Sequence, residues 1–128
     1  MKFVDFQLSS VGSPMRDLFL FLTSSLKLEV LEENFDDLIN FYYENFISCV
    51  ESLKLDTSKF SRDSFDEQMK KDANDEFFHC LVLVKLFTAE VSSTDMSDID
   101  SVLNSKISKA FIDRMRVIVS KFGEKGWL

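Results

Sequence analysis

The sequence has little glycine and proline, and the long stretch from Met15 to Phe122 contains neither. All three glycines and the one proline lie outside that stretch, at Gly12, Pro14, Gly123 and Gly126. Proteins built from β-sheets need tight turns with positive φ, and glycine supplies most of them. Helices can begin and end on Ser, Thr, Asn and Asp instead. The sequence therefore predicts an all-α fold.

Cysteine is also scarce, since the chain has only Cys49 and Cys80. They form no CxxC pair and no zinc-ligand spacing, so they indicate two small buried side chains in a reducing compartment. Long apolar runs are missing as well. The longest near the N-terminus covers residues 18–22, which is too short to span a membrane, and no signal-peptide cleavage pattern accompanies it. We therefore expect a cytoplasmic protein without a membrane span.

Charge is unevenly spread along the chain, which has a formal net charge of −7. Residues 1–104 carry 9 basic and 20 acidic side chains, whereas residues 105–128 carry six basic and two acidic ones. An acidic body argues against nucleic-acid binding, which needs a basic face. The basic C-terminal segment can contact an acidic partner or anionic lipid, pack on the acidic body, or form a solvated helix face, and the sequence leaves these alternatives open.

Catalytic side chains are difficult to assemble from this sequence. His79 is the only histidine, and on a helix it points about 100° away from its neighbour Cys80, so the two form no nucleophile–base pair. A calcium-binding loop beginning at Asp56 would place Phe60 and Ser61 where the loop needs a ligand and a glycine. No HExxH, GxSxG or GxGxxG motif occurs. We therefore expect no catalytic residue, no metal and no cofactor, with an enzyme of unrecognised site as the remaining alternative.

The beginning of the helical region is marked by Ser13 and Pro14, an N-cap residue followed by proline in the first helical turn. We expect residues 1–12 to form an N-terminal leader. Residues 13–128 are expected to form a single helical domain, a bundle of five or six helices. The first helix is predicted to continue through Leu26.

Apolar side chains recur at helical spacing from Leu31 to Leu53 and predict one long helix, or two helices that separate near Asn40. Ser61 is a candidate N-cap for the helix that follows. Polar segments predict three breaks between helices, at residues 56–58, 70–75 and 92–98.

The segment at residues 77–91 is apolar on nearly every side, which is typical of the central helix of a bundle. Residues 81–84 could instead form a buried strand, but the length of the segment favours a helix. A final helix is predicted at residues 99–122, with Gly123 as the residue that ends it.

Phenylalanine is abundant, with 14 residues against two tyrosines and one tryptophan. Consecutive aromatic residues, such as Phe41, Tyr42 and Tyr43, cannot all face one core when they lie on a helix. Some should line a groove or an interface, unless a bundle of three layers buries them all. An apolar groove with an acidic rim is the kind of surface that accepts an amphipathic helix.

Four segments resemble the BART-like domain, a family of helical effectors that bind the GTP form of Arf-like small GTPases. They are FLFLTSSLKLEVLEENFDDLINF (residues 19–41), YYENFISCVESL (42–53), SKFSRDSFDEQM (58–69) and EFFHCLVLVKLFTAEV (76–91). The chain departs from the family in that the polar link between the second and third helices is shorter or absent, and residues 99–122 have no clear place in the resemblance.

The resemblance implies a hydrophobic groove that takes the N-terminal amphipathic helix of an Arf-like GTPase, in the cytoplasm or the cilium. We expect such a groove near five partner-binding residues, without a one-to-one match to the groove residues of the family: Phe60, Phe65, Phe78, Val82 and Phe87. We therefore expect a non-catalytic protein-interaction module. The alternative is a constitutive structural subunit of a larger assembly or homo-oligomer, which would use the same aromatic side chains as a permanent interface.

Overall fold

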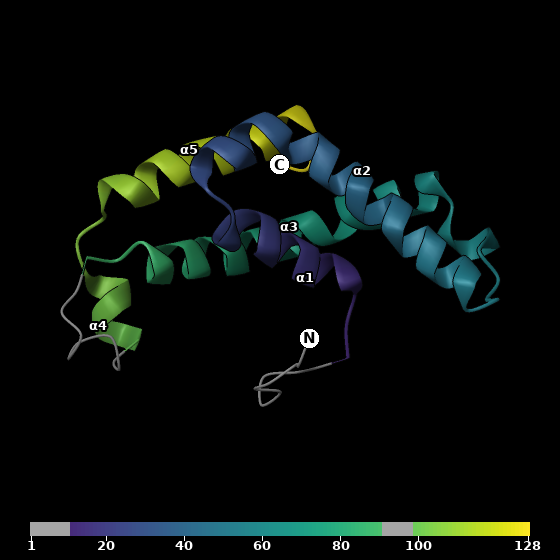
Figure 1. Cartoon of the computed structure of the whole chain (residues 1–128). Helices are drawn as coiled ribbons and strands as arrows, with labels where there is room; N and C mark the ends of the chain where they lie inside the picture. The colour runs from purple at the N-terminus through teal and green to yellow at the C-terminus, as the bar shows by residue number, and fades with distance from the viewer. Residues whose placement is uncertain (1–10, 91–98) are drawn as a thin grey trace.

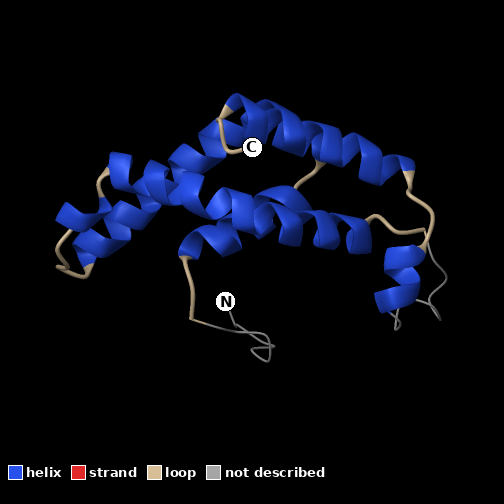
Figure 2. Cartoon of the chain, turned by 180° about the vertical axis from the view of Figure 1, so that it is seen from behind, coloured by secondary structure: helices blue, strands red, loops and turns tan. Residues whose placement is uncertain are grey.

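The computed structural model describes residues 11–90 and 99–128, which form helices joined by short loops (Figure 2). Within these two ranges there are five α-helices and no β-strand. The all-α fold predicted from the scarcity of glycine and proline is therefore confirmed. Most of the expected leader at residues 1–12, and the whole of the break expected at residues 92–98, lie outside the described residues.

The first helix, α1, spans Pro14–Leu20 and begins where the sequence predicts. The Ser13 hydroxyl accepts a hydrogen bond from the backbone N–H of Met15 at 3.3 Å, which caps the helix. A wide turn of π-helix, η1, follows over Phe21–Ser25, so the first helix is not regular as far as Leu26. Thr23 is buried in this turn and donates its hydroxyl hydrogen to the carbonyl oxygen of Phe19 at 2.7 Å.

Helix α2 spans Leu28–Ser52 and contains a kink at Asn34, so two helical stretches meet there rather than near Asn40. It continues through Asn40, and its irregular residue is Asn34, with φ −120° and ψ 15°. Val50, near its end, is buried. After α2 the chain turns at Lys54, whose φ is 56°, a value that favours glycine.

A short 3₁₀ turn, η2 (Ser58–Phe60), precedes helix α3 (Arg62–Phe87). The break expected at residues 56–58 is present, and the Ser61 hydroxyl caps α3 by accepting from the backbone N–H of Ser64 at 3.2 Å.

The break predicted at residues 70–75 is wrong, because α3 runs straight through this segment. The segment contains no glycine or proline to end a helix. Ala73 is fully buried within it, and Asp72 accepts a hydrogen bond from the side chain of Gln68 one turn earlier at 2.7 Å. The strand alternative for residues 81–84 is excluded by the same continuous helix.

The single helix predicted at residues 99–122 is in fact two helices, α4 (Ile99–Asn104) and α5 (Lys109–Glu124). Ser108 begins the second of them, since its hydroxyl accepts from the backbone N–H of Phe111 at 3.1 Å. The apolar spacing continues across the break, but the serines at either side of it favour caps over helix interior.

The helices form two layers in Figure 1, with the first part of α2 beside α5 in one layer and α1 beside α3 in the other. Side chains from both layers meet in one core. Its fully buried members include Phe19, Leu22, Leu31, Met69, Ala73, Cys80, Val84 and Phe122.

Aromatic rings occupy the centre of this core, around Phe122 near the end of α5. Its ring centroid lies 5.5 Å from that of Phe19, 5.7 Å from that of Phe77 and 5.3 Å from that of Trp127. The helix ends later than the sequence predicts, because Gly126, with φ 65°, terminates it in place of Gly123.

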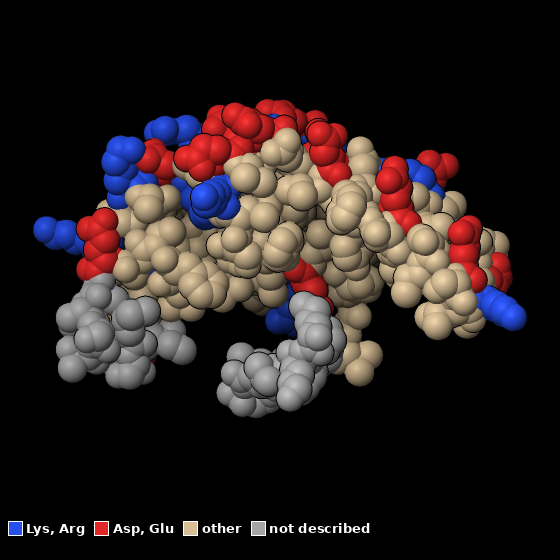
Figure 3. Space-filling view, in the orientation of Figure 1, with Lys and Arg blue, Asp and Glu red and all other residues tan. Residues whose placement is uncertain are grey.

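Acidic side chains gather along the upper edge of the molecule over α2, beside the basic side chains of α5, in the view of Figure 3. The basic C-terminal segment lies partly on this acidic body, since Lys125 of the α5 C-cap pairs with Asp36 of α2. No helix in the described part of the chain has the length and the apolar character that crossing a membrane requires.

Candidate functional site

A groove of about 390 Å³ opens where the start of α1 faces the second half of α2 and the start of α3. Its lining comes from all three helices and from η2. The lining residues are Ser13, Pro14, Met15, Phe46, Lys59, Phe60, Ser64, Phe65 and Gln68. We call this surface the Phe60–Phe65 groove, because it unites two of the five residues predicted to bind a partner.

Aromatic rings hold the groove together on one side. The ring of Phe60 meets that of Phe46 edge to face at 5.4 Å, and the ring of Phe65 lies 5.1 Å from that of Tyr43. The Tyr43 hydroxyl donates a hydrogen bond to the backbone carbonyl oxygen of Phe60 at 3.0 Å, which fixes η2 against α2. Phe65 is buried, whereas Phe60 stays 39% exposed.

Lys59 is the one charged residue in the lining of the groove. Its backbone is held in place, because the Ser64 hydroxyl donates to the Lys59 carbonyl oxygen at 3.2 Å. Among the residues that the structure describes, no carboxylate lies within ion-pair distance of its ammonium group. The Gln68 amide, by contrast, already donates to Asp72.

Arg62 links α2 to α3 just outside the groove. Its guanidinium donates to Asn40 Oδ1 at 2.6 Å and to both carboxylate oxygens of Asp66 at 2.8 and 2.9 Å. It also lies 5.4 Å from the ring centroid of Tyr43 and 5.8 Å from that of Phe65. These contacts hold the aromatic wall of the groove rigidly between the two helices.

A second hollow, of about 500 Å³, is bounded by Arg62 and by charged and apolar side chains. Its lining combines three acidic and three basic side chains with Ile39 and Trp127. Its charged residues are Arg62, Asp63, Asp66, Glu67, Lys70 and Lys125. Because the two signs balance, it offers no clear preference for an anion or a cation.

The other three predicted partner-binding residues lie away from the Phe60–Phe65 groove. Phe78 is about 20 Å further along α3 than Phe65 and about 140° around the helix from it, by helical geometry. Val82 follows one turn later on the same face as Phe78 and is half-buried. Phe87 ends α3, about 33 Å from Phe65 along the axis. Phe78 and Phe87 are 67% and 69% exposed, so the five side chains line no common groove.

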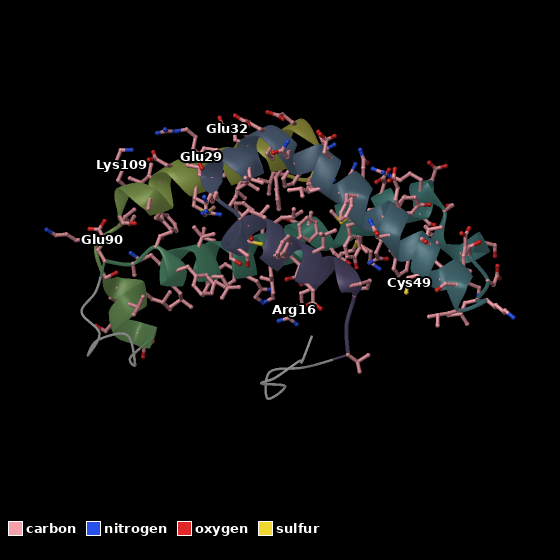
Figure 4. The ribbon with its side chains drawn as sticks, in the orientation of Figure 1. Arg16, Glu29, Glu32, Cys49, Glu90 and Lys109 are labelled. Atoms are coloured by element: carbon pink, nitrogen blue, oxygen red, sulfur yellow. The ribbon has the colours of Figure 1, made fainter. Side chains whose placement is uncertain are left out.

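His79 has a defined set of neighbours on the same long helix. Its Nδ1 lies 3.0 Å from Glu76 Oε2, and Arg16 Nε of α1 lies 3.8 Å from the same oxygen. Arg16 projects from the face of α1 that points away from α2 and α5, as Figure 4 shows. The described residues hold no group of three or more His, Cys, Asp and Glu side chains able to bind a metal ion.

Burial alters the ionisation of two side chains that do not line the groove directly. Burial raises the pKa of the Cys80 thiol, and burial with the nearby Asp17 carboxylate raises the pKa of the Tyr42 phenol. Both groups therefore stay neutral at physiological pH. Tyr42 stacks on Phe46, with ring centroids 6.4 Å apart and planes 4° from parallel, so it supports the aromatic wall.

The sequence does not identify Met15, Phe46 and Gln68 as groove residues. They belong to three different helices, and only the packing of α1 across α2 and α3 brings them together. The sequence gives a hint only for Phe46, which belongs to the apolar stripe of α2. Such a position predicts that the side chain is buried, and it does not predict a groove.

A protein-family model, the ecdysteroid kinase-like family, matches residues 1–55. This match covers α1, η1 and α2 and less than half of the chain, so it is a similarity and does not establish membership. The resemblance to the BART-like domain is wrong, because the family model that matches these residues is the kinase-like one. Amphipathic helix spacing, which carried that resemblance, is common to helical bundles in general. No curated protein and no solved structure matches the chain.

The match also bears on catalysis. The name of the matching family points toward an enzyme. The comparisons therefore do not confirm the expectation that the chain is non-catalytic.

Proposed function

We propose that this chain is a non-catalytic helical interaction module whose Phe60–Phe65 groove accepts the apolar face of an amphipathic helix. The observation that carries the proposal is the groove itself. It joins exposed Phe60 to Met15, Phe46 and buried Phe65, with a few polar groups at its rim. Anchoring of apolar side chains in such a trough is the usual way that a helix is bound in a groove.

The size of the groove limits what it can hold. A volume of about 390 Å³ is near the lower end of the range for pockets that bind small molecules. Such a volume suits one or two anchoring side chains of a partner helix, while the rest of that helix lies across η2 and the start of α1. Burial of a few central anchors supplies most of the affinity in complexes of this kind.

The test is a selection from a random peptide library against the purified chain, followed by mapping of the bound peptides by NMR. Selected peptides should carry apolar residues at helical spacing, and they should shift the resonances of Met15 and Gln68. The substitution Phe60→Ala should weaken binding at least about tenfold, the effect of losing one good anchor.

Phe78→Ala is the matched control, because Phe78 is an exposed phenylalanine of α3 outside the groove. It should leave peptide affinity unchanged. Peptides that bind Phe60→Ala as tightly as the unaltered chain, or that shift resonances around Phe78 instead, would overturn the proposal.

A second candidate is a constitutive helical part of a larger, kinase-like assembly, and the family match over residues 1–55 favours it. In that case the exposed rings of Phe21, Phe41 and Phe78 would pack permanently against other protein. Light scattering and titration with Mg-ATP separate the candidates. Self-association or nucleotide binding would favour the kinase-like assembly, whereas a monomer that binds helical peptides and no nucleotide would favour the interaction module.

A further inference from the structure

We infer that the Phe60–Phe65 groove selects a partner helix with a carboxylate beside its apolar face, and that Lys59 pairs with that carboxylate. The inference rests on the proposed function and adds the charge of the partner. It concerns a single rim residue within a largely apolar lining, so it can be tested separately from the groove itself.

The first argument is that the ammonium group of Lys59 is not engaged in an ion pair with any described residue. Lys59 is exposed, and it is the only charged member of the lining. Its backbone is anchored through Ser64, so the side chain starts from a fixed point beside Phe60. A partner carboxylate placed there would meet the cation without disturbing an existing ion pair.

The second argument concerns the acidic side chains nearby. Asp63, Asp66 and Glu67 line the other hollow, on the opposite side of Arg62, and none lines the groove. The first turn of α3 supplies Ser64 to the lining and carries Asp63, whose carboxylate offsets the positive end of the helix dipole. The positive charge that the groove offers to a partner is therefore that of Lys59.

The charge of Lys59 and the net charge of the chain predict opposite preferences for the charge of a bound peptide. A chain of net charge −7 should attract a basic peptide through long-range electrostatics. Binding in the groove should instead favour an acidic peptide, because the pair with Lys59 is short-range.

The experiment uses two synthetic amphipathic helices with the same leucine and phenylalanine face, one flanked by glutamates and the other by lysines. Fluorescence anisotropy with the full chain should show the acidic peptide binding about two- to fivefold more tightly, the effect of one exposed ion pair. Added salt should reduce this preference. The variant Lys59→Glu should reverse it.

Lys71→Glu is the matched control, since Lys71 is an exposed lysine of α3 outside the groove and the substitution changes the net charge equally. It should keep the preference for the acidic peptide. A preference of the unaltered chain for the basic peptide, or one that Lys59→Glu leaves intact, would overturn the inference.

Failure of the inference differs from failure of the proposed function. If both peptides bind equally and Phe60→Ala weakens both, the groove is real and only its charge selection is wrong. If neither peptide binds, or if both bind Phe60→Ala normally, the groove and the inference fail together.

Discussion

The indole ring of Trp127 meets the ring of Phe122 edge to face, with centroids 5.3 Å apart and planes at 85°. Two backbone hydrogen bonds bring them together. The N–H of Trp127 donates to the carbonyl oxygen of Phe122 at 2.9 Å, and the N–H of Gly126 donates to that of Gly123 at 3.0 Å. This is a Schellman motif, in which Gly126 takes the left-handed position and Trp127 makes the accompanying apolar contact.

Gly126→Ala should destabilise the fold by about 1–2 kcal/mol, the cost of placing a side chain at positive φ. No heavy atom lies within 4 Å of the added methyl group, so the cost comes from the backbone alone. Urea unfolding provides the measurement. Gly123→Ala is the control, because Gly123 lies inside α5 with equal space around it, and it should stabilise by up to about 1 kcal/mol. Equal effects of the two substitutions would contradict this account.

Lys54 occupies the same position after α2, where the motif recurs without glycine. Its φ is 56°, and the N–H groups of Lys54 and Leu55 donate to the carbonyl oxygens of Glu51 and Val50. Lys54→Gly should therefore raise the free energy of unfolding by about 0.5–1 kcal/mol, measured by urea denaturation. Lys54→Ala should give no such gain, because alanine keeps the cost of positive φ. A gain with alanine would attribute the effect to the lost charge instead.

The composition of the chain was sufficient to predict an all-α fold. The first residues of the helices were predicted correctly only where the sequence has a recognisable N-cap residue. Ser13 and Ser61 cap α1 and α3 as expected. Residues 70–75 failed as a break, because a polar segment without glycine or proline remains helical when one of its faces, here Ala73, is buried. The burial of Ala73 depends on the helices that pack against it, so it cannot be predicted from the neighbouring residues in the sequence.

The site was less predictable than the fold. Phe60 and Phe65 lie close in sequence, and the chain brings them into one groove. Phe78, Val82 and Phe87 were grouped with them through the resemblance to the BART-like domain, which is wrong. A continuous α3 instead spaces these three side chains about 20 to 33 Å along the helix axis from Phe65, with Phe78 and Val82 on a different face from it.

Lys85 is buried and fastens the link between α4 and α5. Its ammonium group donates to the carbonyl oxygens of Ser105 at 2.8 Å and Lys106 at 2.9 Å. Lys85→Met keeps most of the side-chain volume but leaves both oxygens without this donor. It should lower the free energy of unfolding by about 1.5–3 kcal/mol. Hydrogen exchange at residues 105–108 should speed up at the same time.

Lys71→Met is the control for Lys85→Met, since Lys71 is exposed on the same helix. It should change the stability by less than about 0.5 kcal/mol. If Lys85→Met were equally mild, the two hydrogen bonds would contribute little beyond what water supplies.

The two cysteines should differ in reactivity toward a thiol reagent such as DTNB. Cys49 is exposed on α2, and Figure 4 shows it at the surface, whereas Cys80 is fully buried. Burial also raises the pKa of the Cys80 thiol, which keeps the unreactive protonated form. Cys49 should therefore react within the folded protein, and Cys80 only as fast as the protein opens. Immediate reaction of both thiols would contradict the buried position of Cys80.

The raised pKa of Cys80 also predicts how the stability changes at alkaline pH. In the unfolded chain a cysteine loses its proton near pH 8.5, while the buried thiol of the folded state keeps it. The folded state then binds more protons, so this contribution to stability is complete below about pH 8.5 and is lost as the pH rises toward the folded-state pKa. The slope from this one group approaches about 1.4 kcal/mol per pH unit. Urea unfolding from pH 7 to 10 should show a flatter decline for Cys80→Ala, which is less stable at pH 7, whereas Cys49→Ala should decline in parallel with the unaltered chain.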